Sequence, residues 1–93
     1  MEFEWDPDKE RENIQKHGVS FSEAATVFGD PFSLVFYDPD HSEEEDRHLI
    51  IGMSSVGRLL ISSHSERDDT VRIINAREVT RGERKDYEEG EKF

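Results

Sequence analysis

The sequence predicts an α+β fold in which a small antiparallel sheet carries its helices on one side. Three observations lead to this prediction. Alternating apolar residues mark several short strands, two Ser/Thr-x-x-Glu pairs mark helix starts, and an acidic run separates the first part from a strand-rich second part. With 93 residues and 32% apolar composition the chain has material for one core, so we expect a single domain over residues 1–93.

The first residues predict a short edge strand and then a surface helix. Phe3 and Trp5 alternate with acidic residues, which is the pattern of a strand with one apolar face. Asp6-Pro7 is typical of a helix start, because Asp caps free N–H groups and proline suits the first turn. Lys16-His17-Gly18 is typical of a helix end, with cations in the last turn and a glycine that can become left-handed.

A second helix is predicted by the capping box that Ser20 and Glu23 form. Its apolar residues recur at helical spacing, and they are Phe21, Ala24, Ala25 and Phe28. Gly29-Asp30-Pro31 ends this helix, because glycine and proline both disfavour its continuation.

Four further strands are expected as an antiparallel meander joined by short turns. We place them at 32–37, 47–54, 58–67 and 70–77. The residues 38–46 include six acidic side chains and have too little apolar content to fold, so we expect a mobile acidic loop.

A last helix is predicted by a second capping box, formed by Thr80 and Glu83. It ends before Gly90, and Tyr87 is its one clear apolar anchor. Because Gly82 lies in its first turn, its intrinsic helical tendency is low.

The net charge of −11 is unevenly distributed. Residues 1–46 carry 14 acidic against three basic side chains, whereas residues 47–93 carry nine of each. The average acidity argues against nucleic acid, whose binding depends on Lys and Arg. Residues 47–81, however, contain six arginines, four acids and no lysine, and arginine makes paired hydrogen bonds to phosphate or carboxylate.

Composition also excludes several classes of protein. Without cysteine there is no disulfide scaffold, thiolate zinc site or cysteine nucleophile. No apolar stretch approaches the roughly 20 residues that cross a bilayer, so we expect no membrane contact. The amino terminus is acidic where a secretory signal is basic and then apolar, and we expect a cytoplasmic protein.

The strand at 58–67 carries the strongest candidates for chemistry. Its even positions place Arg58, Ser62, His64 and Glu66 on one face. A two-residue turn would set Glu66 opposite Val71, whereas a three-residue turn would set it opposite Arg72. We favour the three-residue turn, since it collects His64, Glu66, Arg72 and Arg58 on one polar face.

Such a face has the groups required for metal-independent RNA cleavage. In that reaction the ribose 2′-hydroxyl attacks the neighbouring phosphate, which requires a proton acceptor, a proton donor and positive charge. Histidine can serve in either proton role near neutral pH. The alternative is purely structural, with Glu66 and Arg72 as a cross-strand ion pair beside an inert, half-buried His64.

Other candidate sites are weaker. Asp38, Asp40 and His41 offer oxygen and imidazole ligands for a divalent ion, although short acidic loops are usually only solvated. Lys16 and His17 are also explained as a helix cap. Phosphate-binding glycine loops, nucleophile elbows and paired-histidine metal motifs are absent from the sequence, and we expect neither a metal nor a cofactor.

Several strings together resemble the BrnT toxin family. They are Phe3-Glu-Trp-Asp-Pro-Asp-Lys9, Asn13-Ile-Gln-Lys-His-Gly-Val-Ser-Phe21, Glu23-Ala-Ala-Thr-Val-Phe28, Arg58-Leu-Leu-Ile61, His64-Ser-Glu-Arg67 and Arg72-Ile-Ile-Asn-Ala-Arg77. The spacing of Arg81, Glu83, Arg84 and Tyr87 also fits, so the resemblance covers residues 3 to about 89. It implies a RelE-like α+β fold and a ribonuclease toxin of a type II toxin–antitoxin system.

The resemblance also implies partners and site residues. It implies a BrnA antitoxin whose ribbon-helix-helix domain binds operator DNA, so that DNA contacts this chain only indirectly. The family's polar strand positions fall on His64, Glu66, Arg67, Arg72 and Arg77, and its terminal-helix cations fall on Arg81 and Arg84. Our own hypothesis for the catalytic residues is that His64 or Glu66 acts as general base and that Arg67 and Arg72 act as phosphate clamps. We expect the substrate to be bound by Arg58, Arg77, Arg81, Arg84 and Lys16, with Arg81 as an anchor for the substrate.

Two function classes remain open from the sequence. One is a ribonuclease that a protein neutralises by covering its arginines. The other is a catalytically silent module that binds the antitoxin and acts only as a co-repressor. The acidic first half favours the second class, and the presence of His64, Glu66 and Arg72 favours the first.

Overall fold

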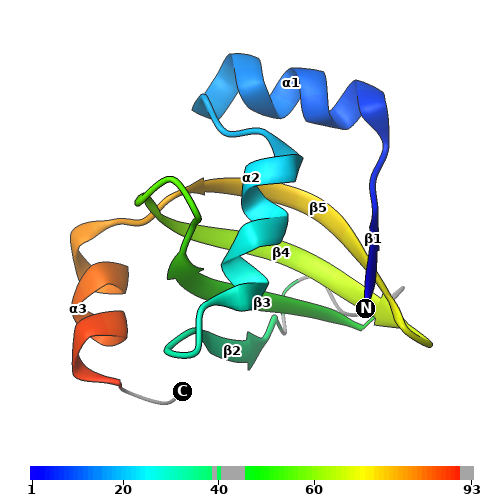
Figure 1. Cartoon of the computed structure of the whole chain (residues 1–93). Coiled ribbons are helices and arrows are strands. Elements are labelled where there is room, and N and C mark those ends of the chain that lie inside the picture. The colour runs from blue at the N-terminus through cyan, green and yellow to red at the C-terminus, as the bar shows by residue number, and fades with distance from the viewer. Residues whose placement is uncertain (39, 41–45, 91–93) are drawn as a thin grey trace.

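The computed structural model describes residues 1–38, 40 and 46–90, in which five strands form one sheet in the order β1-β5-β4-β3-β2 (Figure 1). The strands are β1 (Glu2–Glu4), β2 (Leu34–Tyr37), β3 (Arg47–Met53), β4 (Leu59–Arg67) and β5 (Thr70–Glu78). The helices are α1 (Pro7–His17), α2 (Phe21–Thr26), a 3-10 turn (Val27–Gly29) and α3 (Arg81–Glu89). The predicted α+β element order is confirmed, and no helix among these residues is long and apolar enough to cross a bilayer.

Strand β1 is an edge strand, as predicted, but it runs parallel to its neighbour. It pairs with β5 through Phe3 opposite Val71, while the other four strands form the predicted antiparallel meander. The expectation of an entirely antiparallel sheet is therefore wrong. Phe3 is partly buried at this position and contacts Phe28, with ring centroids 5.2 Å apart.

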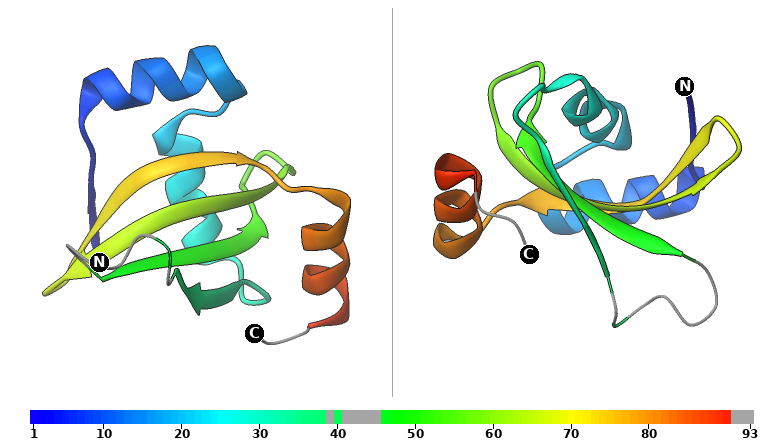
Figure 2. Two further views of the ribbon diagram at one scale, coloured as in Figure 1. Left: turned by 180° about the vertical axis from the view of Figure 1, so that it is seen from behind. Right: turned by 90° about the horizontal axis from the view of Figure 1, so that it is seen from below.

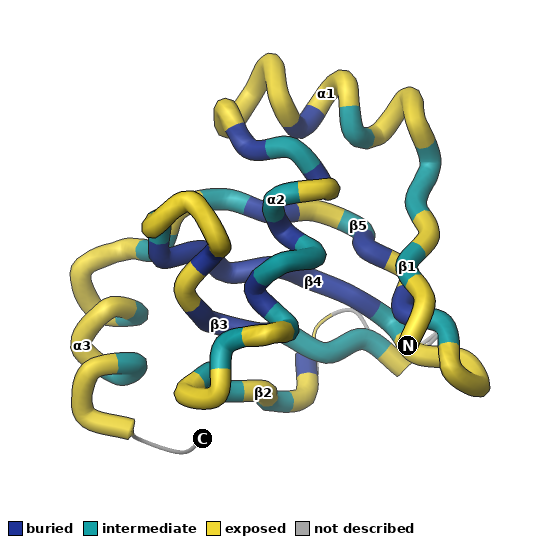
Figure 3. The backbone as a smooth tube through the Cα atoms, in the orientation of Figure 1, coloured by how far each residue is buried: buried dark blue, intermediate teal, exposed yellow. Residues whose placement is uncertain are grey.

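Helices pack on both faces of the sheet, so the prediction that they share one side is wrong (Figures 1 and 2). We call the face under α2 the front face and the face that α3 contacts the back face. The front core contains Val19, Phe21, Ala24, Val27, Ile50, Leu60, Val71, Ile73 and Ala76. The smaller back core contains Ile51, Leu59 and Ile61, with Phe36, Leu49, Val79 and Tyr87 packed on it. Apolar residues on both faces of β4 require cover on both sides, which explains the arrangement (Figure 3).

Helix α1 begins and ends as predicted. The Asp6 side chain accepts a hydrogen bond from the N–H of Asp8, and Gly18 closes the helix with a φ of +69°. Its one buried residue is Asn13, whose amide donates to the carbonyls of Val19 and Ala76 and accepts from the N–H of Ala76. Asn13 therefore occupies the place that a neighbouring strand would take beside β5.

The predicted capping box of α2 is only half correct. Ser20 accepts a hydrogen bond from the N–H of Glu23, but the Glu23 carboxylate does not return to Ser20. It binds Arg58 and the Ser54 hydroxyl instead, because a charged partner makes a stronger hydrogen bond than a backbone amide. Helix α2 ends at Thr26, where the 3-10 turn takes over.

The capping box of α3 is confirmed, with Thr80 and Glu83 bonded reciprocally. Tyr87 anchors this helix as predicted, since its ring joins the back core and its hydroxyl donates to Asp30 at 2.6 Å. Burial and this hydrogen bond raise the pKa of Tyr87 to about 12. Much of the predicted acidic loop, at 39 and 41–45, lies outside the described residues.

His64 lies in the front core, which contradicts its predicted place on a solvent-facing surface. Its side chain is 1% exposed, beneath Phe28 at a centroid distance of 4.8 Å and stacked on His48 at 5.9 Å. Neither ring nitrogen has a hydrogen-bond partner among the described residues. The Oε2 atom of Glu66 lies 3.8 Å from Nε2 of His64, too far for a hydrogen bond.

We predict that Asn13→Ala destabilises the protein by about 1–3 kcal/mol, because it leaves buried backbone groups of Val19 and Ala76 without partners. Thermal unfolding should report a fall in Tm of about 4–8 °C for each kcal/mol. Gln15→Ala, an exposed change on the same helix, is the control. Equal melting temperatures for the two variants would contradict the role given to Asn13.

We also predict that stability falls on mild acidification. Burial lowers the pKa of His64 below its ordinary value of 6.5, and the Glu66 carboxylate only partly opposes this. Below pH 6.5 the His64 imidazole is therefore protonated in the unfolded chain but stays neutral in the folded chain. The free energy of unfolding should decrease by up to about 1.4 kcal/mol per pH unit, until the pH reaches the folded pKa.

Urea unfolding of the native chain and of His64→Phe between about pH 5 and pH 7 measures this slope. The variant should show a flatter profile. The carboxylates with lowered pKa, those of Glu23, Asp30 and Glu83, lose their contribution only below their ordinary values of 4.5, 3.8 and 4.5. Identical profiles for the two proteins would rule out His64 as the titrating group.

Candidate functional site

The turn between β4 and β5 determines the face on which each candidate residue lies. Arg67 pairs with Thr70, so the turn has two residues, Asp68 and Asp69. The predicted three-residue turn is therefore wrong. Asp68 has a φ of +57°, a left-handed conformation that Asp adopts more readily than most residues.

A β-bulge in β5 accompanies this turn. Ser63 pairs with Asn75 and His64 with Ile73, which leaves Ile74 as an extra residue on β5. Simple alternation would place Ile73 and Ala76 on opposite faces of β5, because they are three residues apart. The extra residue at the bulge lets both side chains point into the front core.

Residues opposite one another in a sheet share a face, so the register separates the predicted catalytic residues. Glu66 lies opposite Val71 on the front face, at the end of β4 where its side chain is 51% exposed. Arg72 lies opposite Ser65 on the back face. The predicted convergence of His64, Glu66, Arg72 and Arg58 on one polar face is therefore wrong.

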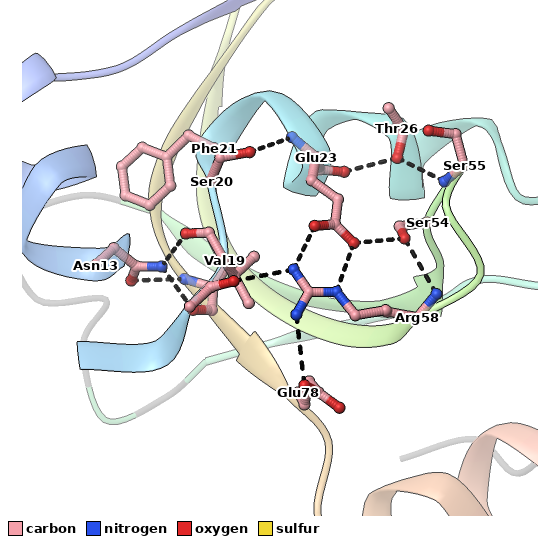
Figure 4. Close-up of polar contacts among 12 residues, drawn as sticks. Asn13, Val19, Ser20, Phe21, Glu23, Thr26, Ser54, Ser55, Arg58 and Glu78 are labelled. Atoms are coloured by element: carbon pink, nitrogen blue, oxygen red, sulfur yellow. Dashed lines mark hydrogen bonds and ion pairs between the residues drawn. The ribbon is translucent and has the colours of Figure 1, made fainter. Parts of the chain in front are cut away.

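Arg58 is held by other parts of the protein (Figure 4). Its guanidinium makes a two-point ion pair with Glu23, in which Nε donates to Oε2 at 2.9 Å, and Nη2 donates to the Gly18 carbonyl at 3.0 Å. The hydrogen bond from Arg58 lowers the pKa of Glu23 although burial opposes it. Arg58 thus joins α2 to β4, about 20 Å along the strand from His64.

The back face carries a polar row across four strands. Arg47, Ser65, Arg72 and Glu4 stand side by side, one from each of β3, β4, β5 and β1. The Arg72 Nη1 lies 3.3 Å from Oε2 of Glu4, and both side chains are about half exposed. Among the described residues, helix α3 packs on the other end of this face, where Tyr87 joins the back core (Figure 2).

An open pocket of about 400 Å³ lies beside this row, and we call it the hairpin pocket. Its lining consists of Glu4, Ser65, Arg67, Asp68, Thr70 and Arg72. Arg67 is exposed there and has no hydrogen-bond or ion-pair partner within the described part of the chain. The lining therefore brings two guanidiniums, those of Arg67 and Arg72, and two carboxylates, those of Glu4 and Asp68, to the same open pocket. The guanidiniums suit a bound phosphate, and a carboxylate beside it can accept a proton from a reacting hydroxyl group.

The remaining predicted cations lie elsewhere. Arg77 is bound at two points by Glu83, with N–O distances of 2.9 and 3.0 Å, and the hydrogen bonds raise the pKa of Arg77. The guanidiniums of Arg81 and Arg84 are exposed on α3 and have no partner among the described residues. Lys16 lies on α1, where it lines a second pocket of about 380 Å³ with Arg77.

The described residues contain no group of three His, Asp or Glu side chains placed to hold a metal ion. Of the predicted ligand set of Asp38, Asp40 and His41, residue 41 lies outside the described residues. Asp38 itself is buried beside β3, where its N–H donates to the Arg47 carbonyl at 2.9 Å.

Sequence reasoning missed Glu4 and Ser65 as members of the candidate site. Glu4 belongs to the edge strand, whose acidic residues were interpreted only as its polar face. Its meeting with Arg72 depends on the parallel pairing of β1 with β5, between segments 68 residues apart. Local patterns carry no signal for such a pairing.

Comparison with known proteins places this arrangement in a family. A 1.1 Å crystal structure of the Brucella abortus ribonuclease toxin BrnT superposes with a TM-score of 0.63 at 19% identity, over 87% of this chain and 99% of that one. This likeness shows a shared fold. No curated protein in the comparison matches the chain. The family model described as "Ribonuclease toxin, BrnT, of type II toxin-antitoxin system" matches residues 5–83. The chain therefore belongs to the BrnT family of ribonuclease toxins from type II toxin–antitoxin systems.

Proposed function

We propose that this chain is a metal-independent endoribonuclease and that the hairpin pocket binds the phosphate it cleaves. The observation that carries the proposal is the meeting of Arg67, Arg72 and Glu4 in one open pocket on the back face. Two guanidiniums can contact the non-bridging oxygens of one phosphate, and arginine is suited to such bidentate contacts.

The proposed reaction is attack of a ribose 2′-hydroxyl on the adjacent phosphorus. The Glu4 carboxylate accepts the hydroxyl proton while the O2′–P bond forms. The P–O5′ bond then breaks, and the leaving 5′ oxygen takes a proton from water. Arg67 and Arg72 stabilise the additional negative charge on the five-coordinate phosphorus. The products are a 2′,3′-cyclic phosphate and a 5′-hydroxyl.

This proposal changes the general base from the one predicted. His64 has both ring nitrogens in the front core, and Glu66 extends from the front face. Arg67 and Arg72, predicted as phosphate clamps, keep that role. Ser65, which lies on β4 and lines the same pocket, is proposed as a hydrogen-bonding group for the same phosphate. Arg81 and Arg84 remain proposed anchors for more distant parts of the RNA.

The family implies an antitoxin, and we propose that it is a BrnA-like ribbon-helix-helix protein. Such a protein would bind operator DNA itself, so this chain would meet DNA only through its partner. We also propose that the fold is RelE-like and that the protein acts in the cytoplasm, where its RNA substrate is found.

A catalytically silent antitoxin-binding module is the second candidate. The observation in its favour is that two of the predicted cations, Arg58 and Arg77, are each bound at two points by a carboxylate. Growth arrest on expression, relieved by co-expression of the neighbouring antitoxin gene, distinguishes the two candidates.

We predict that Arg72→Ala lowers the rate of RNA cleavage by about 10²–10³-fold, because it removes charge from the phosphate site. The fold should persist, since the one ion pair of Arg72 within the described part of the chain is its half-exposed pair with Glu4. The assay follows cleavage of a fluorescently labelled oligoribonucleotide, with Arg11→Ala on α1 as the matched control. Cleavage at the native rate by the Arg72 variant would show that the hairpin pocket does not bind the phosphate that is cleaved.

We predict that Glu4→Gln lowers kcat by about 10²–10⁴-fold, because it removes the proposed proton acceptor. The amide keeps the shape of the side chain but cannot accept the proton. His64→Gln, checked for folding by circular dichroism, tests the base predicted from the sequence. Loss of activity in the His64 variant with normal activity in the Glu4 variant would reverse the assignment.

A further inference from the structure

The second open pocket, between α1 and the edge of β5, has no role in the reaction described above. We call it the helix pocket, and its lining includes the cations of Lys9, Lys16 and Arg77 together with the His17 side chain. We propose that the helix pocket binds a backbone phosphate of the same RNA strand, a few nucleotides from the cleaved bond. This inference rests on the proposed function of the hairpin pocket.

The two pockets are connected along β5. Arg72 lines the hairpin pocket, and Ile74, Asn75 and Arg77 line the helix pocket. Asn75 lies opposite Ser63 and Arg77 opposite Ile61, so both belong to the back face that also carries Arg72. Three residues of strand separate Arg72 from Asn75, or about 10 Å. An extended RNA strand that follows β5 would therefore pass from one pocket to the other.

The lysines of α1 face the pocket as one stripe. Lys9 and Lys16 are seven residues apart, two helical turns, and both line the pocket with Glu12 and Asn13 between them. Both lysines are exposed and have no ion-pair partner among the described residues. Glu12 is the one acid in the lining, so the two lysines leave the pocket cationic even though Glu83 neutralises Arg77.

Helix capping does not explain this stripe. A cation in the last turn suits the helix dipole, which accounts for Lys16 and His17. Lys9, however, lies in the first turn, where a cation opposes the dipole. Its position is therefore unfavourable for the isolated helix, and an anion bound in the pocket would offset that cost.

The pocket is also preorganised. The Asn13 amide fixes α1 to β5 through its bonds to Ala76, so the wall that carries the lysines cannot drift from the strand. A site that is already in place loses little entropy on binding. Since both lysines act as point charges on flexible stems, they suit a phosphate in a strand of any sequence.

The test compares the double variant Lys9→Gln/Lys16→Gln with Arg11→Gln/Lys85→Gln, which removes the same charge away from both pockets. Cleavage is measured on a dinucleotide, which fills only the hairpin pocket, and on a hexanucleotide that reaches both. The lysine variant should raise KM for the hexanucleotide about tenfold, leave kcat unchanged and leave the dinucleotide unaffected. The slope of log KM against log salt concentration should be smaller by about 1.4 for the lysine variant, because each phosphate contact to a single strand contributes about 0.7.

Equal effects of the two double variants, or equal effects on both substrates, would overturn the proposal. Binding of a 2′-O-methyl hexanucleotide, which cannot be cleaved, is measured in parallel by fluorescence anisotropy. If Arg72→Ala cleaves RNA at the native rate while the lysine variant binds this probe more weakly, the proposal for the hairpin pocket is wrong and the proposal for the helix pocket is supported. If the lysine variant binds the probe as tightly as the native chain, the proposal for the helix pocket is wrong, and the proposal for the hairpin pocket is unaffected.

Discussion

The register of β4 against β5 is the constraint on which the candidate site depends. Side chains alternate between the two faces of a strand, so a slip of one residue would exchange every partner across the sheet. With the two-residue turn, His64 lies in the front core and Arg72 lies on the open back face. The bulge at Ile74 then reverses which residues of β5 face the front, so that Ala76 is buried there.

Three carboxylates stabilise the fold, so the acidic composition of the chain is partly structural. Glu23 binds Arg58, Glu83 binds Arg77, and Asp30 accepts hydrogen bonds from Tyr87 and from the Met53 amide. Each joins a helix or turn to the sheet. Part of the negative charge is therefore structural, and the arginines that these acids bind are unavailable to a substrate.

Most elements of the fold followed from local patterns. Helix α1 from Asp6 to Gly18 and the capping box of α3 depend on residues within one turn, so the sequence alone was sufficient. The box at Ser20 failed because Glu23 had a second partner in Arg58, which is 35 residues away. Periodicity could not place the bulge either, since adjacent Ile73 and Ile74 fit both phases of the strand.

The same distinction explains the candidate site. Arg67 was identified through the family resemblance, because it belongs to a contiguous string. Arg72 was identified both by the resemblance and by the strand pattern, although the turn assumed for that pattern was wrong. Glu4 was missed, since it reaches them only through the pairing of the first strand with the fifth. His64 was placed wrongly because alternation gives two faces but does not tell which one α2 covers. A polar residue on an amphipathic strand can equally be a buried group without a partner.

A net charge of −11 is compatible with RNA binding when the distances are considered. At physiological salt the Debye length is about 8 Å, so an exposed acid on the far side of the molecule has little effect on a phosphate in the hairpin pocket. The structure measures 33 × 27 × 24 Å, several times that length. Local groups therefore dominate, and there the pocket combines Arg67 and Arg72 with the acids Glu4 and Asp68. Such a balanced pocket holds a phosphate weakly by itself. A longer strand needs cations beyond it, and along β5 the lysines of α1 are in a position to supply them.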